Sequence, residues 1–190
     1  MDILKHTCKR LGFTRGTLAL AALLIAMLPV SSEEPSRGQK IKAAYIFNFL
    51  RFVQWPAYVL PEGGKLNICV LGPDKFGGAL QALEGRQVKG RAITVSFHSE
   101  FDQIESCHLL FVSALSKDGL PKVLAAARPL NILSVSDVDD FSSLGGMIQF
   151  VSWRNKLRFE INLGAAEKSD LKISSELLRL AKTVVERPEN

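Results

Sequence analysis

The sequence has few of the residues, and none of the short motifs, that most enzymes use for catalysis. Only three histidines occur in 190 residues, and there is no HExxH, CxxC, GxSxG or Walker A motif. His98 and His108 lie in apolar runs without a third metal ligand nearby, so both are predicted to be structural rather than zinc ligands. A hydrolase using His98 with nearby acids would lack a nucleophile motif. These absences predict a protein that is not an enzyme and uses no cofactor.

No strongly apolar run is long enough to cross a membrane as a helix. The run GTLALAALLIAML covers residues 16–28, whereas a spanning helix needs about 18 to 20 residues. Four basic residues precede it, and a proline and small residues follow, which is the pattern of a signal peptide. We therefore predict a signal peptide over residues 1–32, cleavage near Ser32, and export to the periplasm. A retained membrane anchor is the alternative.

The predicted mature chain also lacks an excess of charge. Removing residues 1–32 leaves 20 basic against 18 acidic residues, so the net charge falls from +5 to +2. A nucleic-acid partner is therefore not predicted. Residues 33–190 have the length of one domain, and no internal repeat or long linker divides them.

Cysteine is scarce as well. Cys8 lies in the signal region, so the mature chain keeps only Cys69 and Cys107. An even pair in an oxidising compartment predicts a disulfide, with two buried free thiols as the alternative. Both cysteines lie in strand-like runs that would be neighbours in the sheet.

Residues 40–55, KIKAAYIFNFLRFVQW, are predicted to form a helix that Pro56 ends. Because apolar residues occupy nearly every face, this helix has to be covered on two sides. Either the rest of the domain covers both sides, or a partner subunit or protein covers one. The two apolar stripes are Ile41, Tyr45, Asn48 and Phe52, and Ile46, Phe49, Leu50 and Val53.

Four short apolar runs then predict strands buried on both faces of a sheet: LNICVLG, AITVSFHS, CHLLFVSA and NILSVSD. Between them, FGGALQALEG and GLPKVLAAAR are compatible with helices, which gives the βαβ rhythm of a parallel sheet. Residues 147–163 change to a period of two around a turn at Arg154 and Asn155, which predicts an antiparallel hairpin. A closing helix is predicted at about residues 175–186. The fold class is therefore α/β, with a mostly parallel sheet sandwiched by helices and an antiparallel C-terminal hairpin.

Polar residues at strand ends offer only weak signals for a ligand. The loop LGPDKFGG resembles phosphate-binding turns in outline but lacks GxGxxG, so Asp74 is more simply explained as the cap of a following helix. Asp137, Asp139 and Asp140 gather after the fourth strand, at the edge where open α/β sheets bind ligands. A divalent cation or polar ligand at this edge is one interpretation, and an ordinary loop, in which aspartate is common, is the other.

An ordered set of motifs between residues 42 and 181 resembles the YfiR-like family of periplasmic proteins. The motifs are KAAYIFNFLRFVQWP, CVLG, VSD followed by F, GGMI, RFEINL and SSELLRLA. The resemblance implies an α/β sandwich that forms dimers, is not an enzyme, and represses an inner-membrane diguanylate cyclase by binding its periplasmic sensor part. It also implies that an outer-membrane lipoprotein can sequester the repressor. The output would be lower cyclic di-GMP, with less exopolysaccharide and biofilm.

Two groups of side chains are candidates for the contact surface with such a partner. They are the outward face of the last predicted strand, with Arg158, Glu160 and Asn162, and the first helix, with Tyr45, Phe49, Phe52 and Trp55. Some family members carry a second cysteine pair around the hairpin, where this chain has Ser142 and Gln149. The alternative function is a periplasmic small-molecule sensor that uses loops containing Asp74 and Asp137.

Overall fold

The structure is a computed structural model that describes residues 34–100, 104–113 and 119–185. The predicted signal peptide and its cleavage site lie outside the described residues. In these three ranges, no helix has both the length and the apolar character needed to cross a membrane.

An eight-stranded sheet forms the centre of the domain, in the order β10-β8-β7-β6-β5-β2-β4-β3. Its five inner strands from β7 to β4 run parallel, and β8 runs antiparallel to β7 while β10 pairs parallel with β8. This confirms the predicted fold class. The strands are β2 (Leu66–Leu71), β3 (Gln87–Val88), β4 (Arg91–His98), β5 (Leu109–Val112), β6 (Leu133–Ser136), β7 (Ile148–Trp153), β8 (Lys156–Asn162) and β10 (Thr183–Val185).

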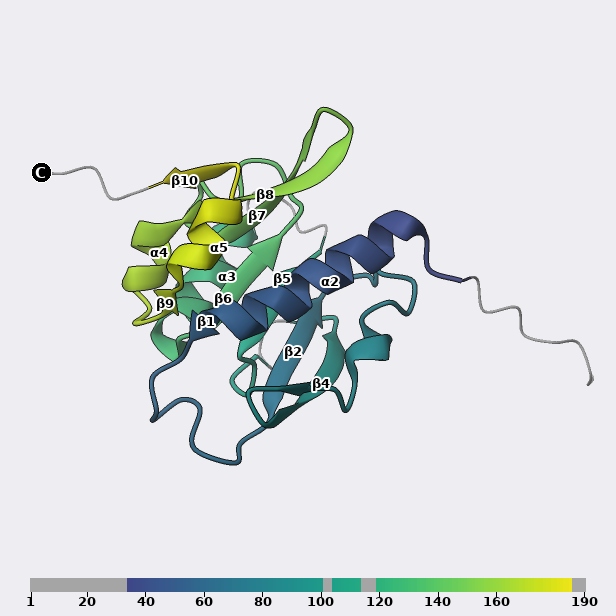
Figure 1. The fold of residues 1–190 in the computed structure, drawn as a ribbon. Coiled ribbons are helices and arrows are strands. Elements are labelled where there is room, and N and C mark those ends of the chain that lie inside the picture. The colour runs from purple at the N-terminus through teal and green to yellow at the C-terminus, as the bar shows by residue number, and fades with distance from the viewer. Residues whose placement is uncertain (1–33, 101–103, 114–118, 186–190) are drawn as a thin grey trace, which may run out of the picture. The chain divides into compact units, whose positions relative to one another are not determined.

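Helices cover both faces of this sheet (Figure 1). On one face, α2 (Arg37–Phe52) and α5 (Ser175–Leu180) cover the larger hydrophobic cluster. On the other face, α3 (Leu120–Ala127) covers a smaller cluster that contains both cysteines. The short α4 (Leu163–Glu167) follows β8, and a separate two-stranded sheet joins β1 (Val53–Gln54) to β9 (Lys172–Ile173).

Helix α2 begins three residues earlier than predicted, because Ser36 and Gln39 form a reciprocal capping box. It ends at Phe52, where Val53 turns to extended backbone and pairs with Ile173. The stripe of α2 that contains Ile46 and Phe49 is completely buried, whereas the stripe of Ile41 is only partly covered in the described structure. The rest of the described domain therefore covers one side of α2 completely and the other side only in part.

One predicted helix does not form, and a second is shorter than predicted. In FGGALQALEG only a 3₁₀ turn forms, at Gln81–Leu83, because Gly77 and Gly78 have φ values of +54° and +83° that a right-handed helix does not accept. The predicted helix 175–186 ends at Leu180, and Thr183–Val185 form β10 instead. These three β-branched residues fit a strand better than a helix, and the edge of β8 gives them a partner.

The predicted disulfide between Cys69 and Cys107 is confirmed. Cys69 lies in β2, and Cys107 lies just before the neighbouring β5, with 5.8 Å between the two Cα atoms. Both side chains are buried beneath α3. The bridge therefore links adjacent strands across one face of the sheet.

Candidate partner-binding site

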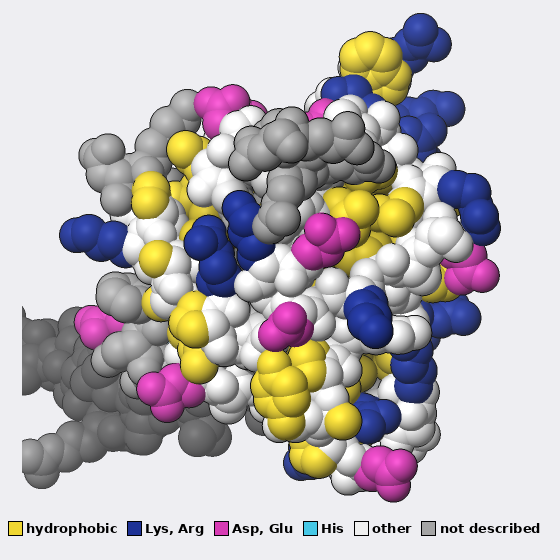
Figure 2. Space-filling view, turned by 90° about the vertical axis from the view of Figure 1, so that its left-hand side faces the viewer, with side chains coloured by type: hydrophobic (Ala, Val, Ile, Leu, Met, Phe, Trp, Pro, Cys, Tyr) yellow, Lys and Arg dark blue, Asp and Glu magenta, His cyan; other side chains and the backbone are white. Residues whose placement is uncertain are grey.

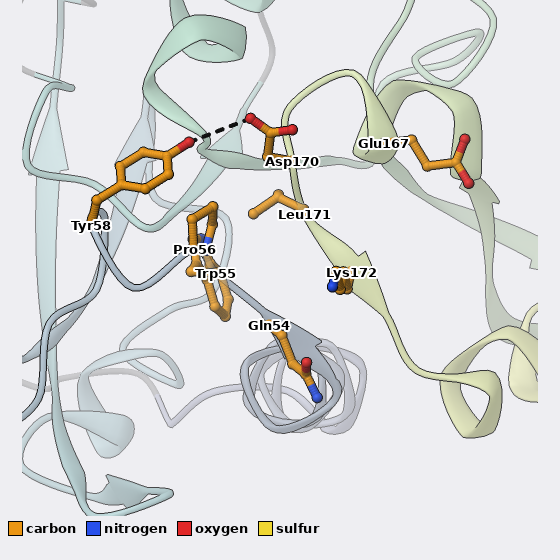
Figure 3. A pocket seen from close by; sticks show the side chains of 8 residues that line it. All are labelled: Gln54, Trp55, Pro56, Tyr58, Glu167, Asp170, Leu171 and Lys172. Atoms are coloured by element: carbon orange, nitrogen blue, oxygen red, sulfur yellow. Dashed lines mark hydrogen bonds between the residues drawn. The ribbon is translucent and has the colours of Figure 1, made fainter.

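A groove of about 460 Å³ opens where the chain leaves α2 (Figure 3). One wall comes from the segment after α2, with Trp55, Pro56 and Tyr58. The opposite wall comes from the segment between α4 and β9, with Asp170 and Leu171. The two walls are held together by the β1–β9 pairing and by a hydrogen bond of 3.3 Å that the Tyr58 hydroxyl donates to the Asp170 carboxylate.

Local backbone geometry positions both walls. Pro56 has no amide hydrogen, so it cannot donate a hydrogen bond that would continue strand β1. Its carbonyl accepts hydrogen bonds from the amides of Val59 and Leu60, which form a turn. On the other side, Asp170 adopts a left-handed conformation with φ of +50° just after α4, and the Leu171 amide donates to Ala166. This helix ending directs the chain back into β9 and leaves Asp170 at the rim.

The inner end of the groove is anchored to the sheet through Trp55 and His108. The Trp55 indole donates a 3.2 Å hydrogen bond to the His108 carbonyl, and the Asn67 amide donates to Nδ1 of His108. Burial lowers the pKa of His108; a hydrogen bond with the Val59 carbonyl opposes this effect, and the positive charge of Arg91 reinforces it. His108 is thus neutral at pH 7, and its contacts agree with the predicted structural role.

The second predicted structural histidine, His98, lies at the end of β4, where Nε2 is 2.8 Å from the Ser96 hydroxyl. Among the described residues, His98 also forms a group with Cys69 and Cys107 that has the side-chain types of a metal site. The two cysteines are joined in the disulfide, so they have no thiolates to offer an ion. This group therefore supports no metal chemistry in the oxidised protein.

The four aromatic candidates on and after the first helix differ in what they expose. Phe49 is completely buried, so it offers no surface to a partner in this structure. Tyr45 is partly covered, with its ring centroid 5.4 Å from that of Phe159. Phe52 is partly exposed beside the Arg51 guanidinium, and Trp55 reaches the groove.

The candidates on β8 lie on the other face of the sheet from α2. Phe159 and Ile161 pack in the cluster under α2, so alternation along the strand turns Arg158, Glu160 and Asn162 the opposite way. The structure therefore does not bring the two predicted halves of the contact surface together.

The three polar β8 candidates have different local partners. Glu160 accepts a 2.8 Å hydrogen bond from the Lys182 ammonium. Asn162 caps α4 by accepting from the Ala165 amide, and it donates to the Ser142 carbonyl. Arg158 is exposed. Of the three, Arg158 is thus the side chain most available to a partner.

The acids proposed as ligand residues at the carboxyl ends of the strands are held by neighbouring groups. Asp137 lies 2.6 Å from the Lys42 ammonium of α2 and 3.8 Å from that of Lys75. Asp74 accepts from the Phe76 amide at 2.6 Å and so caps a turn, where the sequence predicted the cap of a helix. Both carboxylates therefore have structural partners at this edge.

Sequence reasoning missed the second wall of the groove. Asp170 and Leu171 lie more than 100 residues after Trp55, and only the β1–β9 pairing brings them beside it. The one local signal was Tyr58, an aromatic residue in a loop rich in proline and glycine, and it is 73% exposed.

Comparison with known proteins gives both structural and sequence matches. An ABC domain from Streptococcus pneumoniae in complex with L-Trp is 12% identical, with a TM-score of 0.45, and the match covers 63% of this chain and 55% of that one. A conserved domain protein from Vibrio cholerae is 10% identical, with a TM-score of 0.49, over 77% and 60% of the two chains. The chain thus spans less than two thirds of either structure. The sequence model of a family described as YfiR/HmsC-like matches residues 39–182, so this chain belongs to the YfiR/HmsC-like family, which is known for periplasmic regulation of diguanylate cyclases.

Proposed function

We propose that the protein is a periplasmic negative regulator that binds the periplasmic sensor domain of an inner-membrane diguanylate cyclase and holds it inactive. Repression would lower cyclic di-GMP, and with it exopolysaccharide and biofilm. Family membership supports this class of activity. The observation that carries the mechanism is the open groove beside Trp55 and Pro56, residues of the motif that first indicated the family.

The groove has the composition of a protein contact. The apolar part of its lining consists of Trp55, Pro56 and Leu171, and its polar part includes Tyr58, Asp170, Glu167 and Lys172. Protein interfaces commonly have an apolar centre with a polar, hydrated rim, and aromatic residues are enriched among the side chains that dominate binding. We therefore propose that an apolar side chain of the cyclase domain inserts here, with partly exposed Phe52 nearby as a further contact.

Export, dimerisation and sequestration complete the proposal. Removal of residues 1–32 would release the domain into the periplasm, where Cys69 and Cys107 can form their bridge. A homodimer and capture by an outer-membrane lipoprotein follow from the family resemblance.

The variant Tyr58→Ala tests the groove with little risk to the fold, because the side chain is 73% exposed. We expect calorimetry with the purified cyclase sensor domain to show at least about tenfold weaker binding, the loss typical of an interface residue with an important contact. Cells carrying the variant should contain more cyclic di-GMP. The matched control is Leu144→Ala, which removes another apolar side chain that is 39% exposed, away from the groove.

Equal affinity of Tyr58→Ala and the parent protein would remove the groove from the interface. No binding of the parent to the sensor domain would contradict the repressor itself. A thermal-shift response of the parent to a periplasmic metabolite, without binding to the cyclase domain, would favour the small-molecule sensor.

A further inference from the structure

The hairpin of β7 and β8 extends beyond the strands beside it. β6 pairs with β7 only as far as Gln149, and β10 pairs with β8 from Glu160 onward. Within the described part of the chain, no other strand pairs with residues 150–159, which we name the hairpin tip. Figure 1 shows this ribbon projecting from the edge of the domain.

One face of the hairpin tip combines an exposed tryptophan with positive charge. The cross-strand partners Trp153 and Lys156 lie side by side, as do Val151 and Arg158, and directly opposed residues share a face of the ribbon. Trp153 is 48% exposed although the Lys182 ammonium lies 5.0 Å from its ring centroid. Hydrophobic and Lys or Arg side chains stand together at the top of Figure 2.

The turn of the hairpin adds a further cation in an unfavourable conformation. Arg154 and Asn155 both have positive φ, +49° and +56°, as a type I′ turn requires, and asparagine or glycine is the usual residue at both places. The Arg154 guanidinium lies 5.7 Å from the Trp153 ring centroid. The arginine is thus not explained by the turn itself, and such strain is often found at functional sites.

Charge on this surface is strongly one-sided. Arg154, Lys156 and Arg158 are exposed cations, and the nearby Glu160 is neutralised by its 2.8 Å contact with Lys182. The whole predicted mature chain carries a net charge of only +2. Three exposed cations thus lie beside one exposed aromatic side chain in a chain that has almost no net charge.

We propose that the hairpin tip docks on a membrane surface containing anionic phospholipid. Tryptophan favours the interface between headgroups and acyl chains, and lysine and arginine are attracted to anionic headgroups. A projecting ribbon can reach a flat surface with Trp153 inserted and its cations at headgroup level. This inference relies on the proposed function only for its location, beside the inner membrane.

Docking by the tip would leave the groove free for the cyclase domain. Helix α2 begins near the carboxyl ends of the parallel strands, where Lys42 contacts Asp137. The chain leaves the helix near the amino ends of these strands, where Trp55 contacts the His108 carbonyl. The hairpin turn lies beyond the carboxyl end of β7, on the same side as Asp137, and the groove lies on the side of His108. The two surfaces thus lie at opposite ends of the parallel strands.

The test is co-sedimentation of the mature protein with vesicles of phosphatidylcholine alone, or of phosphatidylcholine and phosphatidylglycerol in equal parts. We expect binding to the anionic vesicles only, lost at high salt. Each cation near an anionic surface contributes about a fivefold factor, so Arg154→Asn, Lys156→Thr and Arg158→Thr together should lower the partition coefficient about a hundredfold. Trp153→Phe should abolish the blue shift of tryptophan fluorescence, because Trp55 is the one other tryptophan.

The matched control removes three exposed cations elsewhere, in Lys65→Ser, Lys122→Ser and Lys168→Ser. An equal loss in this control would show that diffuse charge binds the vesicles and would overturn the proposal, as would the absence of binding by the parent. If the parent protein does not bind vesicles and the triple variant of the hairpin tip loses affinity for the soluble cyclase domain, the tip is a protein contact instead of a membrane contact. Failure of the cyclase proposal is seen separately, as the absence of binding between the parent protein and the soluble cyclase sensor domain in the calorimetric titration.

Discussion

Replacing Gly146 by alanine is expected to destabilise the domain by about 3 kcal/mol, because an added methyl group would overlap the ring of Phe141. A Cβ atom at Gly146 would lie 2.6 Å from Cζ of Phe141 and closer still to Cδ1 and Cε1. The ring is completely buried in the cluster under α3, so it cannot swing into solvent. The backbone cannot withdraw either, since the Gly146 amide donates a 2.9 Å hydrogen bond to the Phe141 carbonyl.

The magnitude follows from how little the site can relax. Inserting one methyl group into a packed core usually costs about 1 to 3 kcal/mol, and this overlap belongs at the upper end. For a domain of this size, about 3 kcal/mol corresponds to a melting temperature lower by roughly 6 to 12 °C. The remaining stability of a typical domain, about 5 to 15 kcal/mol, lets the variant still fold and be measured.

The assay is urea unfolding followed by circular dichroism for the parent, Gly146→Ala, Phe141→Leu and the double variant. Phe141→Leu makes room for the methyl group, so the double variant should lose at least about 1 kcal/mol less than the sum of the single losses. Gly38→Ala is the matched control: its Cβ would meet only the Ser36 hydroxyl at 4.0 Å, and helix propensity predicts a gain of about 0.5 to 1 kcal/mol. A loss below about 0.5 kcal/mol for Gly146→Ala would refute the packing argument.

Two further predictions concern the disulfide and His108. The bridge joins residues separated by 38 positions, so loop-closure entropy predicts that replacing both Cys69 and Cys107 by alanine costs about 4 kcal/mol in urea unfolding. An unchanged urea midpoint would contradict that value. Burial, the largest cause, lowers the pKa of His108, so below about pH 6.5 the unfolded chain binds a proton that the folded chain does not. Stability should therefore fall as the pH drops from about 7.5 to 5.5, and His108→Gln should flatten this slope; parallel slopes would count against the assignment.

The parts of the fold that depend on local pattern were predictable. Each of the four short runs rich in Val, Ile, Leu and Phe formed a strand. The change to a period of two marked the hairpin with its turn at Arg154 and Asn155. The cysteine pair was predictable because both residues lay in runs expected to be adjacent strands. For the strands and the hairpin, the residues that determine the structure are close in sequence. For the disulfide, the oxidising compartment predicted for the mature chain supplies the remaining constraint.

The failures have non-local causes. Residues 183–185 continue the spacing of a helix in the sequence. They form a strand instead, because the open edge of β8 offers them hydrogen-bonding partners. The two groups of the expected contact surface, α2 and the polar residues of β8, lie on opposite faces of the sheet, because Phe159 packs under α2 and turns Arg158 away from it. Their binding of a partner stays a prediction. To predict the groove, the sequence would have had to place Leu171 beside Trp55. That proximity comes from the β1–β9 pairing, and strands of two residues leave almost no sequence signal.

Ser142 and Gln149 lie in the region of the hairpin where the family resemblance implies a second cysteine pair in some members, and here they are joined by hydrogen bonds. The amide and the hydroxyl of Ser142 each donate to Oε1 of Gln149 at 3.0 Å, and both residues are buried. A bridge across these seven positions would restrain the unfolded chain by only about 2.5 kcal/mol, against about 4 kcal/mol for the bridge across 38. The chain thus retains the covalent link with the larger entropic effect. Because hydrogen bonds do not respond to reductants, the Cys69–Cys107 bridge is the place where redox conditions can act on this domain.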